Sequence, residues 1–241
     1  MRPAVLGFDA DDTLWDSESH FDRTESLFVE LLTPFAEPDE IRAQLLAYEQ
    51  QRIAIYGFGI KGFTLSMIEV AVDLSNDEIS AADIREIVRW GQSMLEHPVE
   101  LVPGAESTVA SLAADHRLLL ITKGDLHHQR RKVSESGLAA HFEGIEVVAE
   151  KDPATYREVL ERHSVRPSEF MMVGNSLRSD IAPVIAIGGR AIHVPYHLTW
   201  GHEQFDHDEA NAITASPDHF SLSSIVEVPE LLDRLESEPQ Q

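Results

Sequence analysis

Hydrophobic residues near the start of the chain form one short, continuous run. Apart from Gly7, residues 3–8 are all apolar, and an acidic cluster that begins at Asp9 ends the run. An apolar run of this length is typical of a strand that is buried on both faces of a parallel sheet. The pattern therefore predicts a first strand that ends directly at a group of polar side chains.

The segment from about Phe21 to Glu96 has the spacing of amphipathic helices instead. Ser80 followed by Asp83 resembles a capping box at the start of one helix. Its apolar stripe would be Ile84, Ile87, Val88, Gly91, Met94 and Leu95, and two earlier groups have similar spacing: Phe28, Leu31, Leu32 and Phe35, then Ile41, Leu45 and Tyr48. No strand pattern interrupts this segment, so we predict an all-helical unit.

After Pro98, strand and helix patterns alternate as in α/β proteins. Strands are predicted at Leu118–Ile121, Ile145–Val148, Phe170–Val173 and Ala191–Val194, with helices over 104–112, 126–137, from Asp152-Pro153 onward, and up to Gly188. The Ser237–Gln241 tail is expected to be frayed. Right-handed crossovers bring the carboxyl ends of parallel strands to one edge of the sheet, where ligands bind in open α/β folds.

Polar residues that interrupt the apolar pattern fall mostly at these carboxyl ends. They are Asp9, Asp11, Asp12 and Thr13 after the first strand, Thr122, Lys123 and Asp125 after the second, Glu150 and Lys151 beyond the third, and Asn175 and Asp180 after the fourth. Each group alone could be a turn or a helix N-cap. Together they predict one crevice, whose crowded carboxylates repel one another unless a cation neutralises them. Hard oxygen ligands favour Mg²⁺ or Mn²⁺.

Composition narrows the class of partner. The 241 residues include 19 Lys and Arg and 42 Asp and Glu, which gives a formal charge of −23. A charge of this sign repels nucleic acids and anionic membranes. A small anionic substrate is compatible with this charge where a metal reverses the local potential. The chain has no cysteine, which excludes thiolate catalysis and Cys-ligated zinc. The first apolar run is too short for a signal peptide or a membrane span, so we expect a cytoplasmic protein.

At the strand ends, the sequence resembles the haloacid dehalogenase (HAD) superfamily. Its signature is a strand ending in Asp-x-Asp-x-Thr, a second ending in Thr or Ser, a distant Lys, and a Gly-containing loop that closes on Asp. The residues that match in this order are Asp9, Asp11, Thr13, Thr122, Lys151 and Asp180. The resemblance covers nearly the whole chain, because the helical insertion is similar to the cap that one branch of the superfamily carries there.

The resemblance implies a role for each matching residue. Asp9 would attack phosphorus and carry an aspartyl-phosphate, and Asp11 would protonate the leaving oxygen and later accept a proton from water. Thr122 and Lys151 would hold the phosphoryl oxygens. Mg²⁺ would be bound by Asp9, the main-chain carbonyl of Asp11 and Asp180. Thr13 would order the nucleophile loop beside the substrate.

The chain departs from the family pattern at two positions. Asn175 stands where many relatives carry Asp, which leaves it as a direct metal ligand, a water-mediated ligand or no ligand. Asp12 replaces a residue that is often small, and its charge would partly compensate. Lys123 competes with Lys151 for the phosphate, and motif order favours Lys151.

Several other residues have two or more interpretations. Lys61 lies in a glycine-rich break between helices, where it is a solvated lysine, a contact to the substrate or a Schiff-base lysine. The run from His127 to Lys132 is a solvated helix face or holds an anionic substrate. Tyr196 and Trp200 either line the crevice or pack internally. We place Lys61 and Lys123 among the substrate-binding candidates.

The resemblance and the patterns together predict a doubly wound, Rossmann-like α/β core (residues 1–16 and 98–241) with an inserted all-helical cap (17–97). The predicted function is Mg²⁺-dependent hydrolysis of small phosphorylated metabolites, a phosphoric monoester hydrolase. A phosphomutase, another HAD-type hydrolase and a non-catalytic metabolite- or partner-binding protein remain alternatives. The sequence indicates neither the substrate nor the oligomeric state.

Overall fold

The computed structural model describes residues 3–203 and 205–237, so most of the tail predicted to be frayed lies outside the described residues. The strands are β1 (Val5–Phe8), β2 (Arg117–Lys123), β3 (Gly144–Val148), β4 (Phe170–Gly174), β5 (Arg190–His193) and β6 (His219–Ser221). The helices are α1 (Glu18–Leu32), α2 (Pro38–Tyr56), α3 (Ile60–Leu74), α4 (Ala81–Glu96), α5 (Ala105–Ala113), α6 (Leu126–Glu135), α7 (Pro153–Arg162), α8 (Ala182–Ala186), α9 (His207–Thr214) and α10 (Val228–Ser237). None of the helices in this described part is long and apolar enough to cross a membrane.

The six strands form one parallel sheet in the order β3-β2-β1-β4-β5-β6. β1 is therefore central, with Phe8 aligned with Leu120 of β2 and Val173 of β4. The order reverses direction on either side of β1, as in doubly wound folds. This confirms the predicted fold class, and it places the residues after β1, β2 and β4 side by side at one edge.

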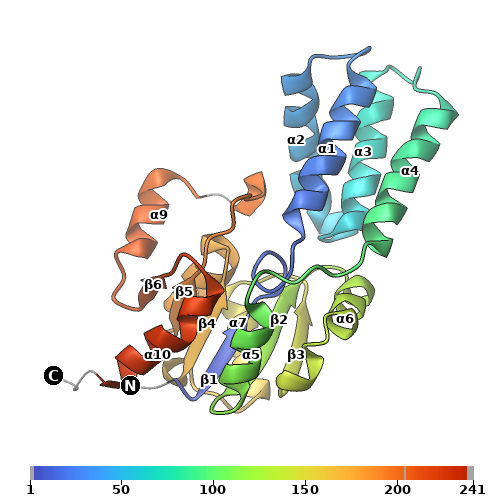
Figure 1. Ribbon diagram of the computed structural model, residues 1–241. Helices are drawn as coiled ribbons and strands as arrows, with labels where there is room; N and C mark the ends of the chain where they lie inside the picture. The colour runs from blue at the N-terminus through green and yellow to red at the C-terminus, as the bar shows by residue number, and fades with distance from the viewer. Residues whose placement is uncertain (1–2, 204, 238–241) are drawn as a thin grey trace.

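Helices cover both faces of the sheet (Figure 1), and each face has its own core. Successive β1 residues point to opposite faces. Leu6 and Phe8 pack with residues of α5, α6 and α10, whereas Val5 packs with residues of α7 and α8. Burial of both faces explains why the strands consist of nearly continuous apolar residues rather than alternating ones.

Helices α1 to α4 form a separate bundle beyond the carboxyl edge of the sheet (Figure 1). The bundle has its own hydrophobic core, formed by residues such as Phe28, Leu45, Met67 and Ile87. The two linkers to the sheet run together, since the Asp16 N–H donates to the Glu100 carbonyl at 2.9 Å. The bundle thus stands directly above the strand ends.

Local capping signals agree with the structure at two helix starts. The Ser80 hydroxyl accepts from the Asp83 N–H at 3.1 Å, and the Asp152 carboxylate accepts from the Thr155 N–H at 2.7 Å. The capping box predicted at Ser80 and the helix start predicted at Asp152-Pro153 are confirmed. Pairs of this type satisfy N–H groups that have no partner within the first turn of a helix.

The sequence analysis missed the last part of the fold. β6 is a three-residue edge strand with only one large apolar side chain, Phe220, so neither alternation nor a hydrophobic run identifies it. Between β4 and α8, the chain forms a single π-helical turn at Leu177–Ile181 instead of entering a regular helix. Such turns often occur at functional sites.

Candidate active site

Asp9 lies at the carboxyl end of the central strand, where its N–H donates to the Val173 carbonyl at 2.9 Å. Its side chain is buried, with only 6% of the residue exposed. The Thr13 hydroxyl donates to Asp9 Oδ2 at 3.0 Å, and Lys151 Nζ donates to Oδ1. These two donors fix the orientation of the carboxylate.

Lys151 is a buried cation between two carboxylates. Its Nζ contacts Asp9 and also donates to Asp180 Oδ1 at 2.7 Å. Although burial favours the neutral amine, the two carboxylates raise the pKa of Lys151 well above its usual range. Burial also raises the pKa of Asp9 to about 7 despite the attraction of Lys151. One lysine therefore does not balance the buried negative charge of this cluster.

Asp180 approaches the strand end because residue 174 is glycine. A Cβ atom at Gly174 would lie 2.3 Å from Asp180 Cγ and Oδ2, closer than any real contact. Asp180 Oδ2 accepts from the Ser176 N–H at 3.0 Å, which holds the carboxylate in this position. The glycine is thus required by the packing of the acidic side chain rather than by its backbone angles.

We expect Gly174→Ala to lower kcat/KM for the phosphate hydrolysis predicted from the sequence by about tenfold or more. The added methyl group would displace Asp180, and with it the partner of Lys151. Steady-state kinetics and a thermal melt measure the two effects separately. Gly188→Ala is a suitable comparison, because a Cβ there meets no atom within 4 Å and only the backbone angle is strained. Full activity in Gly174→Ala would show that the position of Asp180 is unimportant.

Asp11 accepts hydrogen bonds from three side chains of the core. Trp15 Nε1 and Lys132 Nζ donate to Oδ1, the former at 2.6 Å, and Gln129 Nε2 donates to Oδ2 at 2.9 Å. Burial alone would raise the pKa of Asp11, but Lys132 and these hydrogen bonds outweigh it and lower that pKa. The structure therefore holds Asp11 as a carboxylate.

None of these three donors was predicted as a site residue. Gln129 and Lys132 lie in the run from His127 to Lys132, for which the sequence left open a solvated helix face and a contact to an anionic substrate, yet only 12% of the Lys132 side chain is exposed. Gln129 and Lys132 are three residues apart on α6, which begins immediately after β2. The available signal was this spacing on a helix that follows a strand end with candidate site residues.

Thr122 and Asp12 occupy different environments at the edge. Thr122 is fully buried, and its hydroxyl accepts from Gln129 Nε2 at 2.7 Å. Asp12 adopts a left-handed conformation (φ 63°), and its carboxylate accepts from the N–H groups of Ser17 and Glu18, both at 2.9 Å. Asp12 thus organises the entry into α1.

The oxygen atoms near Asn175 suit a small hard cation. The side-chain amide of Asn175 has one atom 3.2 Å from Asp9 Oδ2 and 3.3 Å from the main-chain oxygen of Asp11. If this atom is the amide oxygen of Asn175, it forms a group of three oxygens with Asp9 Oδ2 and the Asp11 main-chain oxygen. If it is the amide nitrogen, it donates hydrogen bonds to both of those oxygens. In the part of the chain that the structure describes, no group of three His, Asp or Glu side chains is arranged to hold a metal. A metal would therefore need the main-chain oxygen and the amide as well.

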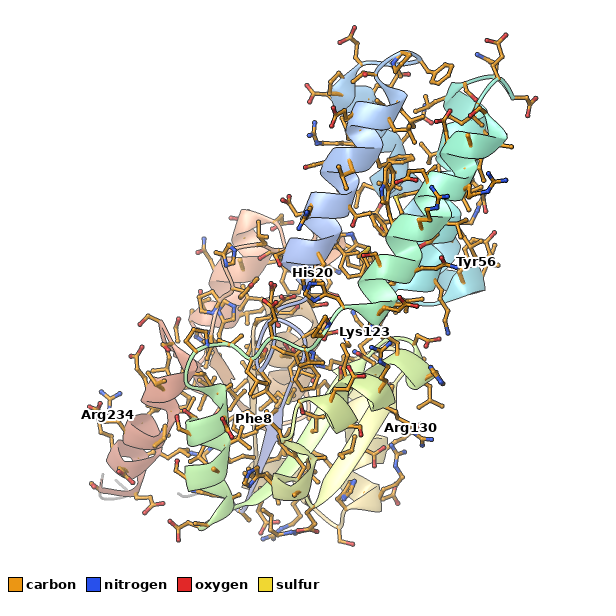
Figure 2. All side chains as sticks on the ribbon, turned by 45° about the vertical axis from the view of Figure 1, so that its right-hand side comes forward. Phe8, His20, Tyr56, Lys123, Arg130 and Arg234 are labelled. Atoms are coloured by element: carbon orange, nitrogen blue, oxygen red, sulfur yellow. The ribbon has the colours of Figure 1, made fainter. Side chains whose placement is uncertain are left out.

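Lys123 and Lys61 lie apart from Asp9. Lys123 donates to Ser179 Oγ at 2.9 Å and pairs with Glu203. It lies at the end of the sheet that faces the helical bundle (Figure 2). Lys61 pairs with Asp125 at 2.9 Å, and half of its side chain is exposed. This ion pair joins the bundle to the core at the rim of the site.

A cavity of about 380 Å³ connects the strand ends to the bundle. The core contributes Asp9, Asp11, Thr122, Lys151 and Asp180, and the opposite wall comes from α1, α2 and the start of α3. This volume lies within the range of small-molecule pockets. The arrangement brings together a buried carboxylate, a second carboxylate two residues on, a buried lysine and a space for a ligand.

Comparisons with known proteins agree with this geometry. The model of the haloacid dehalogenase-like hydrolases matches residues 4–188. A haloacid dehalogenase-like family hydrolase from Xanthomonas campestris is 40% identical, with a TM-score of 0.86 over 98% of this chain and 93% of that one. N-acylneuraminate-9-phosphatase from Mus musculus is 26% identical over 153 residues, 61% of this chain, and the match spans only 57% of that curated relative. A HAD-hydrolase from Bacillus subtilis bound to magnesium shares the fold at 18% identity (TM-score 0.65, 97% of this chain and 100% of that one).

Proposed function

The chain belongs to the haloacid dehalogenase-like hydrolase family, and we propose that it hydrolyses small phosphorylated metabolites with Mg²⁺ and an aspartyl-phosphate on Asp9. The observation that carries this proposal is the buried Asp9 carboxylate, held by Thr13 and Lys151 where a cavity of about 380 Å³ meets the central strand. A carboxylate in such a position is a nucleophile for a phosphoryl group. The phosphatase name of the mouse relative supports the same reaction class.

In the first step, a carboxylate oxygen of Asp9 forms a bond to phosphorus while the bond from phosphorus to the ester oxygen breaks. The leaving oxygen takes a proton from Asp11. Because Lys132, Gln129 and Trp15 favour ionised Asp11 in this arrangement, we expect Asp11 to turn away from Lys132 toward the cavity before it donates.

In the second step, water attacks phosphorus and the bond to Asp9 breaks. Asp11, which the hydrogen bonds from Lys132, Gln129 and Trp15 keep ionised up to this point, accepts the proton of this water. Free phosphate leaves and the Asp9 carboxylate is restored. The protonated Asp11 is then able to donate in the next turnover.

The cofactor would be held by Asp9, Asp180, the main-chain oxygen of Asp11 and Asn175. Oxygen donors without sulfur or histidine are the set that Mg²⁺ prefers. Mg²⁺ supplies positive charge that neutralises the phosphoryl oxygens. Burial and the nearby Asp180 raise the pKa of Asp9 to about 7 despite Lys151, so a further cation beside this carboxylate would favour its ionised form.

Thr122 and Lys151 are the proposed ligands of the phosphoryl oxygens. Lys151 is preferred to Lys123, because it already contacts Asp9, whereas Lys123 is engaged by Glu203 and Ser179. Lys61 stays a candidate for contact with the distal part of a substrate, from its place at the rim. Thr13 would keep the nucleophile oriented.

A phosphate-release screen tests this function. We expect the purified protein to release phosphate from an aryl phosphate and from some sugar phosphates, phosphoamino acids or nucleotides in Mg²⁺, and to lose this activity in excess chelator. Restoration by added Mg²⁺ is the control for damage by the chelator. No phosphate release from any of these compounds in Mg²⁺ or Mn²⁺ would contradict the proposal and favour a binding protein.

A further inference from the structure

The wall of the cavity opposite Asp9 is rich in carboxylates. Glu18, Asp22 and Glu25 of α1 and Glu49 of α2 line it, and Arg42 is the one cation that α1 to α4, all within the described residues, contribute to the lining. Arg42 is paired with Glu25 at 3.4 Å. We call the four carboxylates and the aromatic rings beside them the distal pocket. The two cations beside this pocket among the described residues are both paired: Arg42 with Glu25, and Lys123 with Glu203.

The carboxylates of the distal pocket are electrostatically unfavourable in the empty cavity. Burial, together with Asp12, Glu49, Glu25 and Asp22, raises the pKa of Glu18 to about 9. Burial also raises the pKa of Glu49 to about 8, against a hydrogen bond with Trp200 and with further help from Glu25. Crowded acidic groups of this kind are stabilised by a cation placed among them.

Aromatic rings form the rest of the distal pocket: Phe21, Phe58, Phe63 and Trp200. Phe58 and Trp200 meet edge to face, with centroids 6.1 Å apart. The Phe58 ring already accepts an ammonium group, because Lys123 Nζ lies 4.1 Å from its centroid. Carboxylates beside aromatic faces are the combination that binds alkylammonium groups.

An unsatisfied hydroxyl group lies at the back of the distal pocket. Ser66 is 1% exposed, and its Oγ has no hydrogen-bond partner within the described residues. It lines a space of about 20 Å³ that shares Glu49, Phe58, Phe63 and Trp200 with the main cavity. A space of this size holds about one water molecule or a polar ligand group. A buried hydroxyl without a protein partner requires a water or a ligand group, and this space has room for one.

We infer that the substrate of the proposed reaction carries a protonated amine on its leaving group, as an aminosugar or aminoalkyl phosphate does. This inference rests on the proposed function, because the phosphoryl group must lie at Asp9 for the leaving group to reach the distal pocket. The same pocket offers no unpaired cation among its described residues to a leaving group with a carboxylate, such as the N-acylneuraminate in the name of the mouse relative.

Three six-carbon phosphates test the inference: glucosamine 6-phosphate (cationic amine), glucose 6-phosphate (the same ring without the charge) and 6-phosphogluconate (an open chain with a carboxylate). We expect kcat/KM to be at least roughly tenfold higher for the amine than for the neutral sugar, and lowest for the carboxylate. Glu49→Gln should lower the ratio of amine to neutral sugar by about tenfold, because it removes a carboxyl group that a bound ammonium group would keep ionised. Glu30→Gln, an exposed position on α1 outside the cavity, is the matched control and should leave the ratio unchanged.

Calorimetry with the Asp9→Asn variant separates the inference from the reaction. Tighter binding of glucosamine 6-phosphate than of glucose 6-phosphate supports the distal pocket even if wild-type protein hydrolyses nothing, in which case only the proposed function fails. Equal or weaker binding of the amine, or equal kcat/KM for amine and neutral sugar in an enzyme that does hydrolyse an aryl phosphate, overturns the inference. An unchanged ratio in Glu49→Gln would also overturn it.

Discussion

Asp9→Asn is expected to lower kcat for Mg²⁺-dependent phosphate release by about 10⁴-fold or more, because an amide is not a nucleophile toward phosphorus. The substitution keeps the size of the side chain and an oxygen that can accept from Thr13. It also removes the repulsion between Asp9 and Asp180, which offsets the lost attraction to Lys151. The folded structure should therefore survive. Initial rates, together with far-UV circular dichroism, measure both parts of this prediction.

The control for Asp9→Asn is the same chemical change at a distant position. Asp77 is exposed in the turn between α3 and α4, and its positive φ of 67° is one that Asn also tolerates. Asp77→Asn should behave as wild type. Beryllium fluoride should bind wild-type protein and not Asp9→Asn, since it mimics a phosphoryl group on a carboxylate. Substantial turnover by Asp9→Asn, with deamidation excluded by mass spectrometry, would contradict the assignment of the nucleophile.

Lys151→Met is expected to affect both activity and stability. It removes the cation between Asp9 and Asp180 while keeping a side chain of similar length. Breaking a buried ion pair by removal of one partner costs about 3 kcal/mol or more. We expect the free energy of unfolding without metal to fall by about that amount, and kcat/KM to fall by about 10³-fold. Urea denaturation and steady-state kinetics measure these changes.

The pH and metal dependence of the free energy of unfolding identify why Lys151→Met is less stable. The deficit in stability should grow as pH rises, because both carboxylates are then ionised, and shrink as pH falls and one becomes protonated. Mg²⁺ should stabilise this variant more than wild type. Lys123→Met should have the smaller effect on activity, since Lys123 pairs with Glu203 and not with Asp9. The reverse order of activities would assign the phosphate to Lys123.

The strands of the core were predictable because burial on both faces forces continuous apolar runs, as in 118–121 and 170–173. That the polar residues after these strands lie close together was also predictable, because the carboxyl ends of parallel strands meet at one edge of the sheet. The partners of Asp11 were not predictable in the same way, since Lys132 has the sequence context of a solvated helix. Its burial depends on how α6 packs against the first strand end, which local pattern does not encode.

The distal pocket illustrates the same limit. Glu18, Glu25 and Glu49 are ordinary acidic residues of amphipathic helices, and sequence spacing gives no reason to distinguish them from the many exposed carboxylates of this chain. These three carboxylates differ from the exposed ones only in lining one cavity, which depends on how the helical bundle packs over the edge of the sheet. Lys61 shows the converse, because its glycine-rich setting suggests a substrate loop while the structure pairs it with Asp125.

The central position of β1 has a consequence for the order of folding. Leu6 aligns with Leu118 of β2 and Met171 of β4. Because β1 is synthesised before β2 and β4, it has no strand to pair with until more than 100 further residues have been made. Contacts within the helical bundle are closer in sequence and are expected to form first, because loop closure between distant residues costs more entropy. During synthesis, the apolar strand that carries Asp9 is thus exposed without neighbours, which is the stage at which chaperone binding or aggregation is most expected.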